Sequence, residues 1–182
     1  MIVLDEKPWH FEFDDETPFW KWVLYADNNK DFLKVKNVVK GTKSTDFLGI
    51  YLGNDLNESF LLEIKYYADE NFLPDTDQEI LSDLAQKVRD SLACLIAGSR
   101  NSTHFSAQYS EWIVASQNSN ARLYVAFFVD FPKAWTQNKI KATQGIFLRS
   151  LKQKLNWVTG NIILMDHTNY ANFFQGLKVS KI

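Results

Sequence analysis

Three side chains that can act together on a charged substrate fall at the ends of two neighbouring apolar runs. Asp46 opens the run at residues 45–53, and Glu63 and Lys65 lie in the run at residues 58–67. Both runs have the length and apolar content of β-strands. Because alternate side chains of a strand share a face, Glu63 and Lys65 are expected to project from one side while the apolar residues between them pack on the other.

The turn residues 53–57 join these two runs and predict an antiparallel hairpin. In a hairpin the start of the first strand lies beside the end of the second, so Asp46 is expected to approach Glu63 and Lys65. Two acids and an amine then meet at one end of a sheet, where a cation can sit. The alternative is a solvent-facing strand edge, where a cross-strand ion pair contributes little.

A helix is predicted directly after the hairpin. Pro74 and the capping-box pattern from Thr76 to Glu79 mark its start, and Gly98 is the expected end. Lys87 falls on its flank. Its expected apolar face consists of Ile80, Leu81, Leu84, Val88, Leu92, Leu95 and Ile96.

The remaining segments predict further elements around this unit. Residues 8–13 are expected to form a short strand or an arm. Strands are expected at residues 110–116, 121–131 and 161–166, and helices from Thr17 and at residues 138–156. The alternation of strands and helices predicts an α/β fold, a mixed sheet with helices packed on it. The length fits one domain, residues 1–182, in which residues 1–40 form an N-terminal arm or helix.

The charges are divided unevenly along the chain. Residues 1–91 hold 19 acids and 10 bases, a net charge of −9, whereas residues 92–182 hold 3 acids and 10 bases, a net charge of +7. On the predicted helix at 138–156, Lys141, Arg149 and Lys152 line up beside the apolar face. This segregation favours a polyanionic partner, and the alternative is a basic helix face that is merely solvated.

Composition excludes several classes of protein. The single cysteine, Cys94, excludes an internal disulfide framework and a cysteine-rich zinc site, and indicates a reducing compartment. The three histidines have no metal-ligand spacing. No uncharged run approaches the roughly 20 residues needed to span a bilayer, so we expect a cytoplasmic protein without a membrane partner.

The pattern of Asp46 on one strand and Glu63-x-Lys65 on the next resembles the PD-(D/E)xK, or restriction-endonuclease-like, nuclease superfamily. The segment at 84–98, with Lys87, Arg89 and Asp90, is similar to the Lys-x-Arg-Asp helix of uncharacterised bacterial members. The resemblance covers about residues 44–98. It implies a three-layer α/β/α sandwich with a central mixed β-sheet.

The resemblance also implies a chemistry. Asp46 and Glu63 would bind Mg²⁺, or Mn²⁺, which lowers the pKa of a bound water and stabilises charge on a phosphate. Lys65 would orient or deprotonate that water. Lys87 and the basic residues Lys141, Arg149 and Lys152 would contact nucleic-acid phosphates. The expected protein is a magnesium-dependent endonuclease or phosphodiesterase with DNA rather than RNA as the expected substrate. A homodimer is one possible assembly.

The chain departs from the superfamily pattern in two places. Thr45 stands where the superfamily has proline, and no clear first helix brings another acid to the site, for which Glu12 and Glu16 are weak candidates. A second interpretation therefore stays open. It is a non-catalytic module that retains the nuclease fold and binds nucleic acid or another protein.

Overall fold

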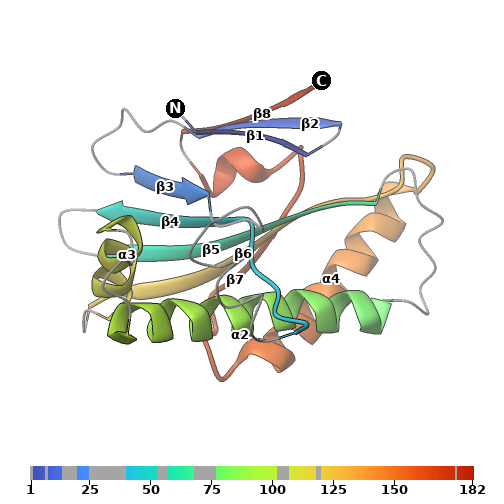
Figure 1. Ribbon diagram of the computed structural model, residues 1–182. Coiled ribbons are helices and arrows are strands. Elements are labelled where there is room, and N and C mark those ends of the chain that lie inside the picture. The colour runs from blue at the N-terminus through green and yellow to red at the C-terminus, as the bar shows by residue number, and fades with distance from the viewer. Residues whose placement is uncertain are drawn as a thin grey trace.

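The structure is a computed structural model, shown in Figure 1. It describes residues 2–6, 8–13, 20–24, 40–52, 57–67, 77–101, 107–117, 120–174 and 176–182.

A mixed β-sheet lies at the centre of the described residues. It has the strand order β3 (Trp20–Leu24), β4 (Phe47–Leu52), β5 (Asn57–Tyr66), β6 (Arg122–Asp130) and β7 (Ile162–Met165). The pairs β3/β4 and β4/β5 are antiparallel, and β5/β6 and β6/β7 are parallel. The predicted mixed α/β fold is therefore confirmed, as is the hairpin of β4 and β5.

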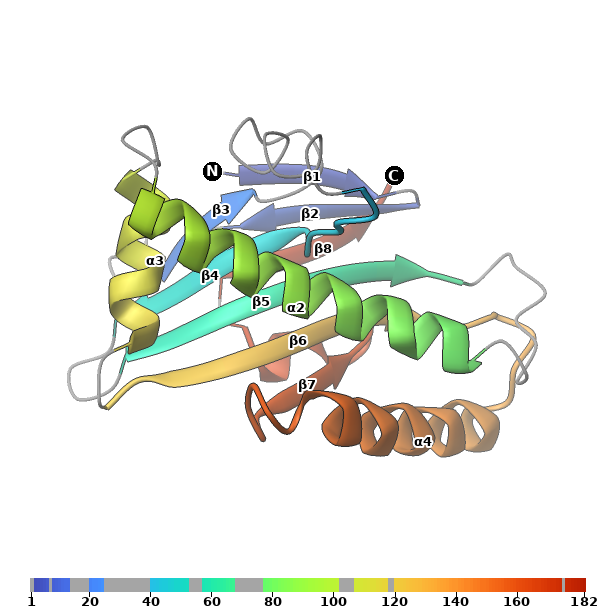
Figure 2. The same cartoon turned by 60° about the horizontal axis from the view of Figure 1, so that its bottom comes forward.

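Three helices of the described chain cover one face of this sheet, as Figures 1 and 2 show. They are α2 (Asp77–Asn101), α3 (Ala107–Gln117) and α4 (Gln137–Leu155). Strand β6 has a continuous rather than an alternating run of buried side chains, so both faces of the sheet at this strand have to be covered. Its side chains Val125, Phe127 and Val129 pack in the core under the helices.

A small sheet covers the opposite face. It has the order β1 (Ile2–Glu6), β2 (Trp9–Phe13) and β8 (Leu177–Lys181), all antiparallel. Trp9, Phe11 and Phe13 alternate along β2. Trp9 and Phe11 pack against Phe128 of β6, and Phe13 packs against Phe47 of β4. A short 3₁₀ turn, η2 (Tyr170–Asn172), also lies on this side. Among the described residues, no α-helix covers this face. This layer differs from the helical layer that an α/β/α sandwich would have.

Two predicted elements are wrong in type. The segment 110–116, predicted as a strand, belongs to helix α3, because Tyr109, Trp112 and Ile113 are buried at helical spacing and Val114 is 72% exposed. The helix expected from Thr17 is contradicted at residues 20–24, which pair with β4 as strand β3.

The remaining elements agree with the sequence apart from their ends. Strand β2 was predicted within residues 8–13, and β6, α4 and β7 lie within a residue or two of the predicted bounds. Helix α2 runs past Gly98 to Asn101, and Ile96, expected on its apolar face, is exposed. Strands β1 and β8 were not predicted. In the described part of the chain, no helix has both the length and the apolar character to cross a membrane.

Candidate active site

The β4/β5 hairpin places Asp46 beside Glu63. Phe47 pairs with Leu62, so one more step in the same register sets Asp46 opposite Glu63. The backbone N–H of Asp46 donates to the carbonyl of Leu62 at 3.0 Å, and its carboxylate accepts from the N–H of Ile64 at 2.7 Å. Asp46 is thus held at the end of β5 by two hydrogen bonds, as the hairpin predicted.

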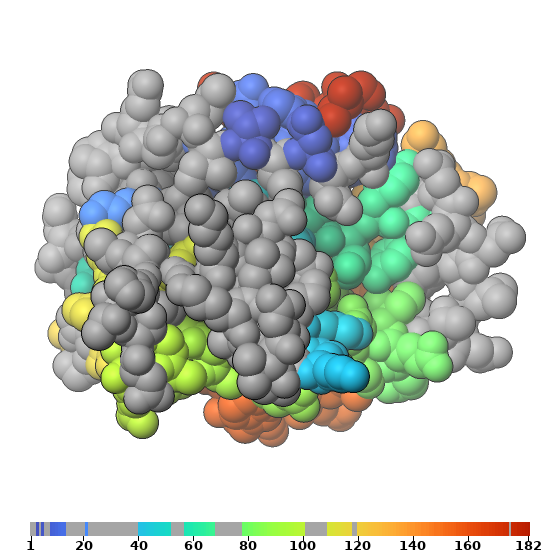
Figure 3. Space-filling view, viewed as in Figure 1, coloured from blue at the N-terminus to red at the C-terminus, as the bar shows by residue number. Residues whose placement is uncertain are grey.

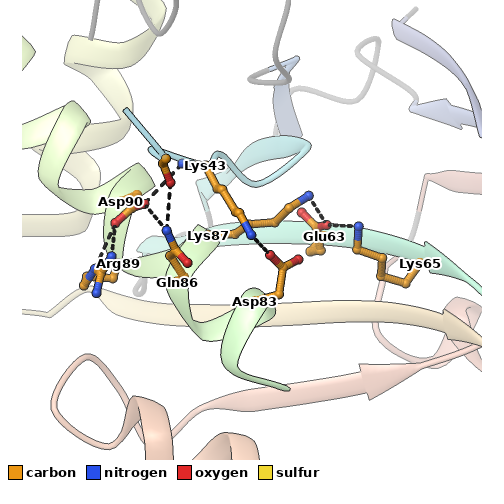
Figure 4. A network of polar contacts seen from close by, with 9 residues as sticks. Lys43, Glu63, Lys65, Asp83, Gln86, Lys87, Arg89 and Asp90 are labelled. Carbon is orange, nitrogen blue, oxygen red and sulfur yellow. Dashed lines mark hydrogen bonds and ion pairs between the residues drawn. The ribbon is translucent and has the colours of Figure 1, made fainter. Parts of the chain in front are cut away.

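Glu63 projects toward helix α2 and is nearly inaccessible, with 1% of its side chain exposed. Lys87 of α2 donates to Glu63 Oε1 at 2.5 Å, and Lys65 Nζ lies 3.2 Å from the same oxygen. Figure 4 shows the two lysines meeting this carboxylate from either side. The structure therefore brings Asp46, Glu63, Lys65 and Lys87 together.

The cluster reaches solvent through Lys65, whose side chain is 29% exposed. In Figure 3 part of the β5 segment, coloured blue-green, comes to the surface between the light-green start of α2 and the blue N-terminal strands. The first residues of the segment before β4, in light blue, lie beside it.

Burial sets the protonation of Glu63. Loss of solvation, together with the negative charge of Asp46, raises the pKa of Glu63 to about 8, although Lys87 and Lys65 act in the opposite direction. Burial disfavours the charged form of Lys87, but the carboxylates of Glu63 and Asp46 outweigh that effect and raise its pKa. Burial therefore favours the protonated form of Glu63, and a bound cation would favour release of that proton.

One oxygen of Glu63 is left over. Oε2 is buried and has no hydrogen-bond partner among the described residues. A buried carboxylate oxygen without a partner is costly, and such atoms in folded proteins call for an explanation. A cation beside Asp46 would satisfy this oxygen, so the two carboxylates fit a hard divalent metal ion.

The acids available for a metal are nevertheless few. In the described part of the chain, no group of three or more His, Cys, Asp or Glu side chains is close enough to hold a metal ion. Glu12 lies on β2, pairs with His10, and alternates with the side chains that face the mixed sheet. Glu16 is outside the described residues. Protein ligands would thus be Asp46 and Glu63, with water completing the shell as Mg²⁺ allows.

Helix α2 holds the segment that leads into Asp46. Ser91 Oγ accepts from the backbone N–H of Thr45 at 2.9 Å, and Asp90 accepts from that of Lys43 at 3.1 Å. Gln86 donates to the carbonyl of Gly41 at 2.8 Å. Gln86 and Asp90 are about one turn apart and Ser91 follows Asp90 directly, so the three side chains lie on the same side of the helix. The position of Asp46 therefore depends on α2 as well as on β5.

Ser91→Ala is expected to lower the free energy of unfolding by about 1 kcal/mol, because it leaves the buried N–H of Thr45 without its acceptor. Ser99→Ala is the matched control. Ser99 is an exposed serine of the same helix, and its hydroxyl donates a hydrogen bond to the carbonyl of Ile96 one turn earlier. Denaturant unfolding of both variants measures the difference. Equal stability of the two would show that the Ser91 contact contributes nothing.

Lys87→Met is expected to cost about 2 kcal/mol of stability at pH 7, since it removes a charged hydrogen bond to the buried Glu63. The cost stays moderate because Lys65 remains and Glu63 can keep its proton. In the double variant Glu63→Gln/Lys87→Met most of the loss should disappear, because the carboxyl group that Lys87 contacts is removed together with its partner. Denaturant unfolding checks both, with exposed Lys152→Met as the control, and additive losses would contradict the pairing.

Helix α4 carries the predicted basic residues, but apart from the cluster. Lys141, Arg149 and Lys152 are exposed, and none forms a hydrogen bond or ion pair with the Glu63 cluster among the described residues. Helix α4 packs beside α2 on the same face of the sheet, as Figure 2 shows. The contact of Lys141, Arg149 and Lys152 with nucleic acid stays a prediction.

The ammonium of Lys87 binds Glu63, and its predicted contact with a phosphate stays a prediction. The sequence offered one signal for this pairing: Lys87 lies between Leu84 and Val88, both fully buried, at the border of the apolar face of α2. The docking contacts of Ser91 and Asp90 carried no such signal.

Comparison of the chain with protein-family models, with curated proteins and with solved structures gives no match, so the interpretation of this site rests on its own geometry.

Proposed function

We propose that this protein is a metal-dependent nuclease of the PD-(D/E)xK type, which hydrolyses phosphodiester bonds in DNA. The observation that supports it most is the buried carboxylate of Glu63, which lies beside Asp46, carries two lysines on one oxygen and has no partner on the other. A structural ion pair would not need a second acid next to a buried glutamate, because like charges raise the cost of ionisation.

The roles of the residues follow from their positions. Asp46 and Glu63 would hold a divalent cation, which supplies charge stabilisation at the phosphate and makes a bound water more acidic. Lys65, the more exposed lysine, would orient that water or, in its neutral amine form, take its proton as the water oxygen attacks phosphorus. The P–O bond to the leaving group breaks, and a proton from solvent neutralises the leaving oxygen. Lys87 would keep Glu63 in place.

The proposed fold, nucleic-acid contacts and dimer follow from the resemblance to the PD-(D/E)xK superfamily. We propose a restriction-endonuclease-like fold for the chain, which is supported by the β4/β5 hairpin and the α2 helix that follows it, the elements that carry the site residues. The exposed cations of α4 would bind the phosphate backbone without regard to sequence. A homodimer would allow both strands of a duplex to be cut.

The test combines metal binding with cleavage. Calorimetric titration with Mg²⁺ and Mn²⁺ is followed by incubation with plasmid and with single-stranded DNA, for the wild type, Asp46→Ala and Glu63→Gln. Glu58→Gln is the matched control, because Glu58 lies on the same strand and bonds to Tyr124 away from the cluster. We expect metal binding and cleavage in the wild type and the control only.

Two outcomes would contradict the proposal. Cleavage that survives both Asp46→Ala and Glu63→Gln would place the activity elsewhere. The absence of both metal binding and cleavage in the wild type would favour the non-catalytic module. Glu63 and its two lysines would then be part of the structural core of that module.

A further inference from the structure

A cleft of about 260 Å³ lies at the ends of strands β6 and β7. Asp130, the last residue of β6, and Asp166, directly after β7, both line it. Parallel strands end at a common edge, and ligands of α/β proteins often bind outside that edge. The cleft is separate from the Glu63 cluster, because Asp130 bonds to Trp9 of the small sheet, whereas Glu63 projects toward α2.

An aspartate and a histidine in this cleft form an oriented pair. His167 Nδ1 lies 2.7 Å from Asp130 Oδ1, and Trp9 Nε1 donates to the other oxygen, Oδ2, at 3.0 Å. The indole of Trp9 also stacks on the imidazole at 5.0 Å. Asp130 is buried, whereas 45% of the His167 side chain is exposed. This arrangement fixes the ring and leaves Nε2 as the nitrogen that is not bonded to Asp130.

The acids of the cleft already accept hydrogen bonds from the protein. Both oxygens of Asp130 are used by Trp9 and His167. Asp166 Oδ2 accepts from Gln144 at 2.9 Å, and Oδ1 accepts from the N–H and the hydroxyl of Thr168 at 2.8 and 2.6 Å. The acids therefore serve to build the site, and the groups left for a ligand are mainly donors.

Those donors are cationic. Lys133 and Lys181 line the cleft, and neither has an ion-pair partner among the described residues. Lys181 lies over the ring of Trp9 at 5.3 Å, which draws it to the cleft wall. Gln137, the first residue of α4, also lines the cleft, and the first turn of that helix contains no acid to offset its positive end. An anion is the ligand that these groups favour.

We propose that this cleft is a second binding site, which takes a phosphomonoester on Lys133, Lys181 and His167. A phosphomonoester has about two negative charges and three acceptor oxygens, which match two ammonium groups and the Nε2–H of a protonated imidazole whose Nδ1–H is held by Asp130. It can come from a free small molecule or from the phosphorylated end of a nucleic-acid strand. The proposal does not depend on the nuclease assignment, since it uses none of the residues of the Glu63 cluster.

The test measures binding to the whole chain in a chelator, so that no metal contributes. Inorganic phosphate, adenosine 5′-monophosphate, and one short single strand with a 5′-phosphate or a 5′-hydroxyl are titrated by calorimetry. Lys133→Ala/Lys181→Ala is expected to weaken phosphomonoester binding at least about tenfold, because each lost charged hydrogen bond is worth about that factor. His167→Gln should weaken it less, since glutamine keeps a hydrogen-bonding end.

Lys178→Ala is the matched control, because Lys178 is an exposed lysine of the same strand as Lys181 and does not line the cleft. Circular dichroism verifies that each variant is folded. Equal binding of phosphate and the monophosphate would identify a small-molecule site, and binding of the 5′-phosphorylated strand alone would identify a strand end. The proposal is overturned if no phosphomonoester saturates the wild type, or if the double variant binds as well as Lys178→Ala. A failed nuclease assay would leave either result unchanged.

Discussion

Lys65→Ala is expected to lower the rate of DNA cleavage by about 10²- to 10⁴-fold, the range associated with a positioned proton-transfer group. The reason is the place of Lys65 in the cluster: its ammonium lies 3.2 Å from Glu63 Oε1 and is the more exposed of the two lysines. Single-turnover cleavage of a plasmid at saturating Mg²⁺ measures the effect on the chemical step.

Lys65→Arg separates the two roles that the lysine can have. Arginine keeps the positive charge but does not release its proton in proteins. If Lys65 takes the proton of the attacking water, Lys65→Arg should be nearly as slow as Lys65→Ala; if it only stabilises charge, much of the rate should return. Exposed Lys178→Ala should cleave like the wild type. A Lys65→Ala enzyme of unchanged rate would remove Lys65 from the reaction.

The metal-free protein is expected to lose stability as the pH rises from about 4.5 to about 8. Glu63 is buried beside Asp46, and its pKa rises from 4.5 to about 8 in the folded state. Between these values the folded chain keeps a proton that the unfolded chain has released, so the free energy of unfolding falls with pH. The shift corresponds to a contribution of up to about 5 kcal/mol, which is large against the stability of a typical domain.

Denaturant unfolding in a chelator at pH 5 and pH 8 measures this loss. Glu63→Gln cannot ionise, so its stability should change much less over the same interval, whereas Glu58→Gln should behave like the wild type. Mg²⁺ should restore stability at pH 8 in the wild type, since a ligand that binds only the folded state stabilises it. The same pH dependence in Glu63→Gln would assign the effect to another group.

Local patterns were sufficient for the part of the fold that forms the site. The β4/β5 hairpin and helix α2 are consecutive in the chain, and each has its own turn, cap or apolar period, so their contacts are short in sequence. Asp46 and Glu63 therefore came together as predicted. The antiparallel register left them no other arrangement.

Long-range packing accounts for what the sequence did not predict. Strands β1 and β8 lie at opposite ends of the chain and join through β2, a pairing that no local pattern encodes. In the α3 segment, Trp112 and Val114 are two residues apart, as the apolar residues of a strand would be. In the structure Trp112 packs against the sheet and its ring N–H donates to the carbonyl of Phe60, a long-range contact that the local pattern does not indicate. The extreme burial of Glu63 depends on α2 lying over β5, which the strand alone cannot indicate.

Helix α2 supports both acids of the site at once. It supplies the lysine that holds Glu63 and the groups that hold the backbone before Asp46. If this helix lifts from the sheet, Glu63 loses its closest cation and its cover in the same event in which the chain before Asp46 loses its anchors, and only the hydrogen bonds of Asp46 to β5 remain. Anything that binds or releases this one helix therefore acts on the whole site at once.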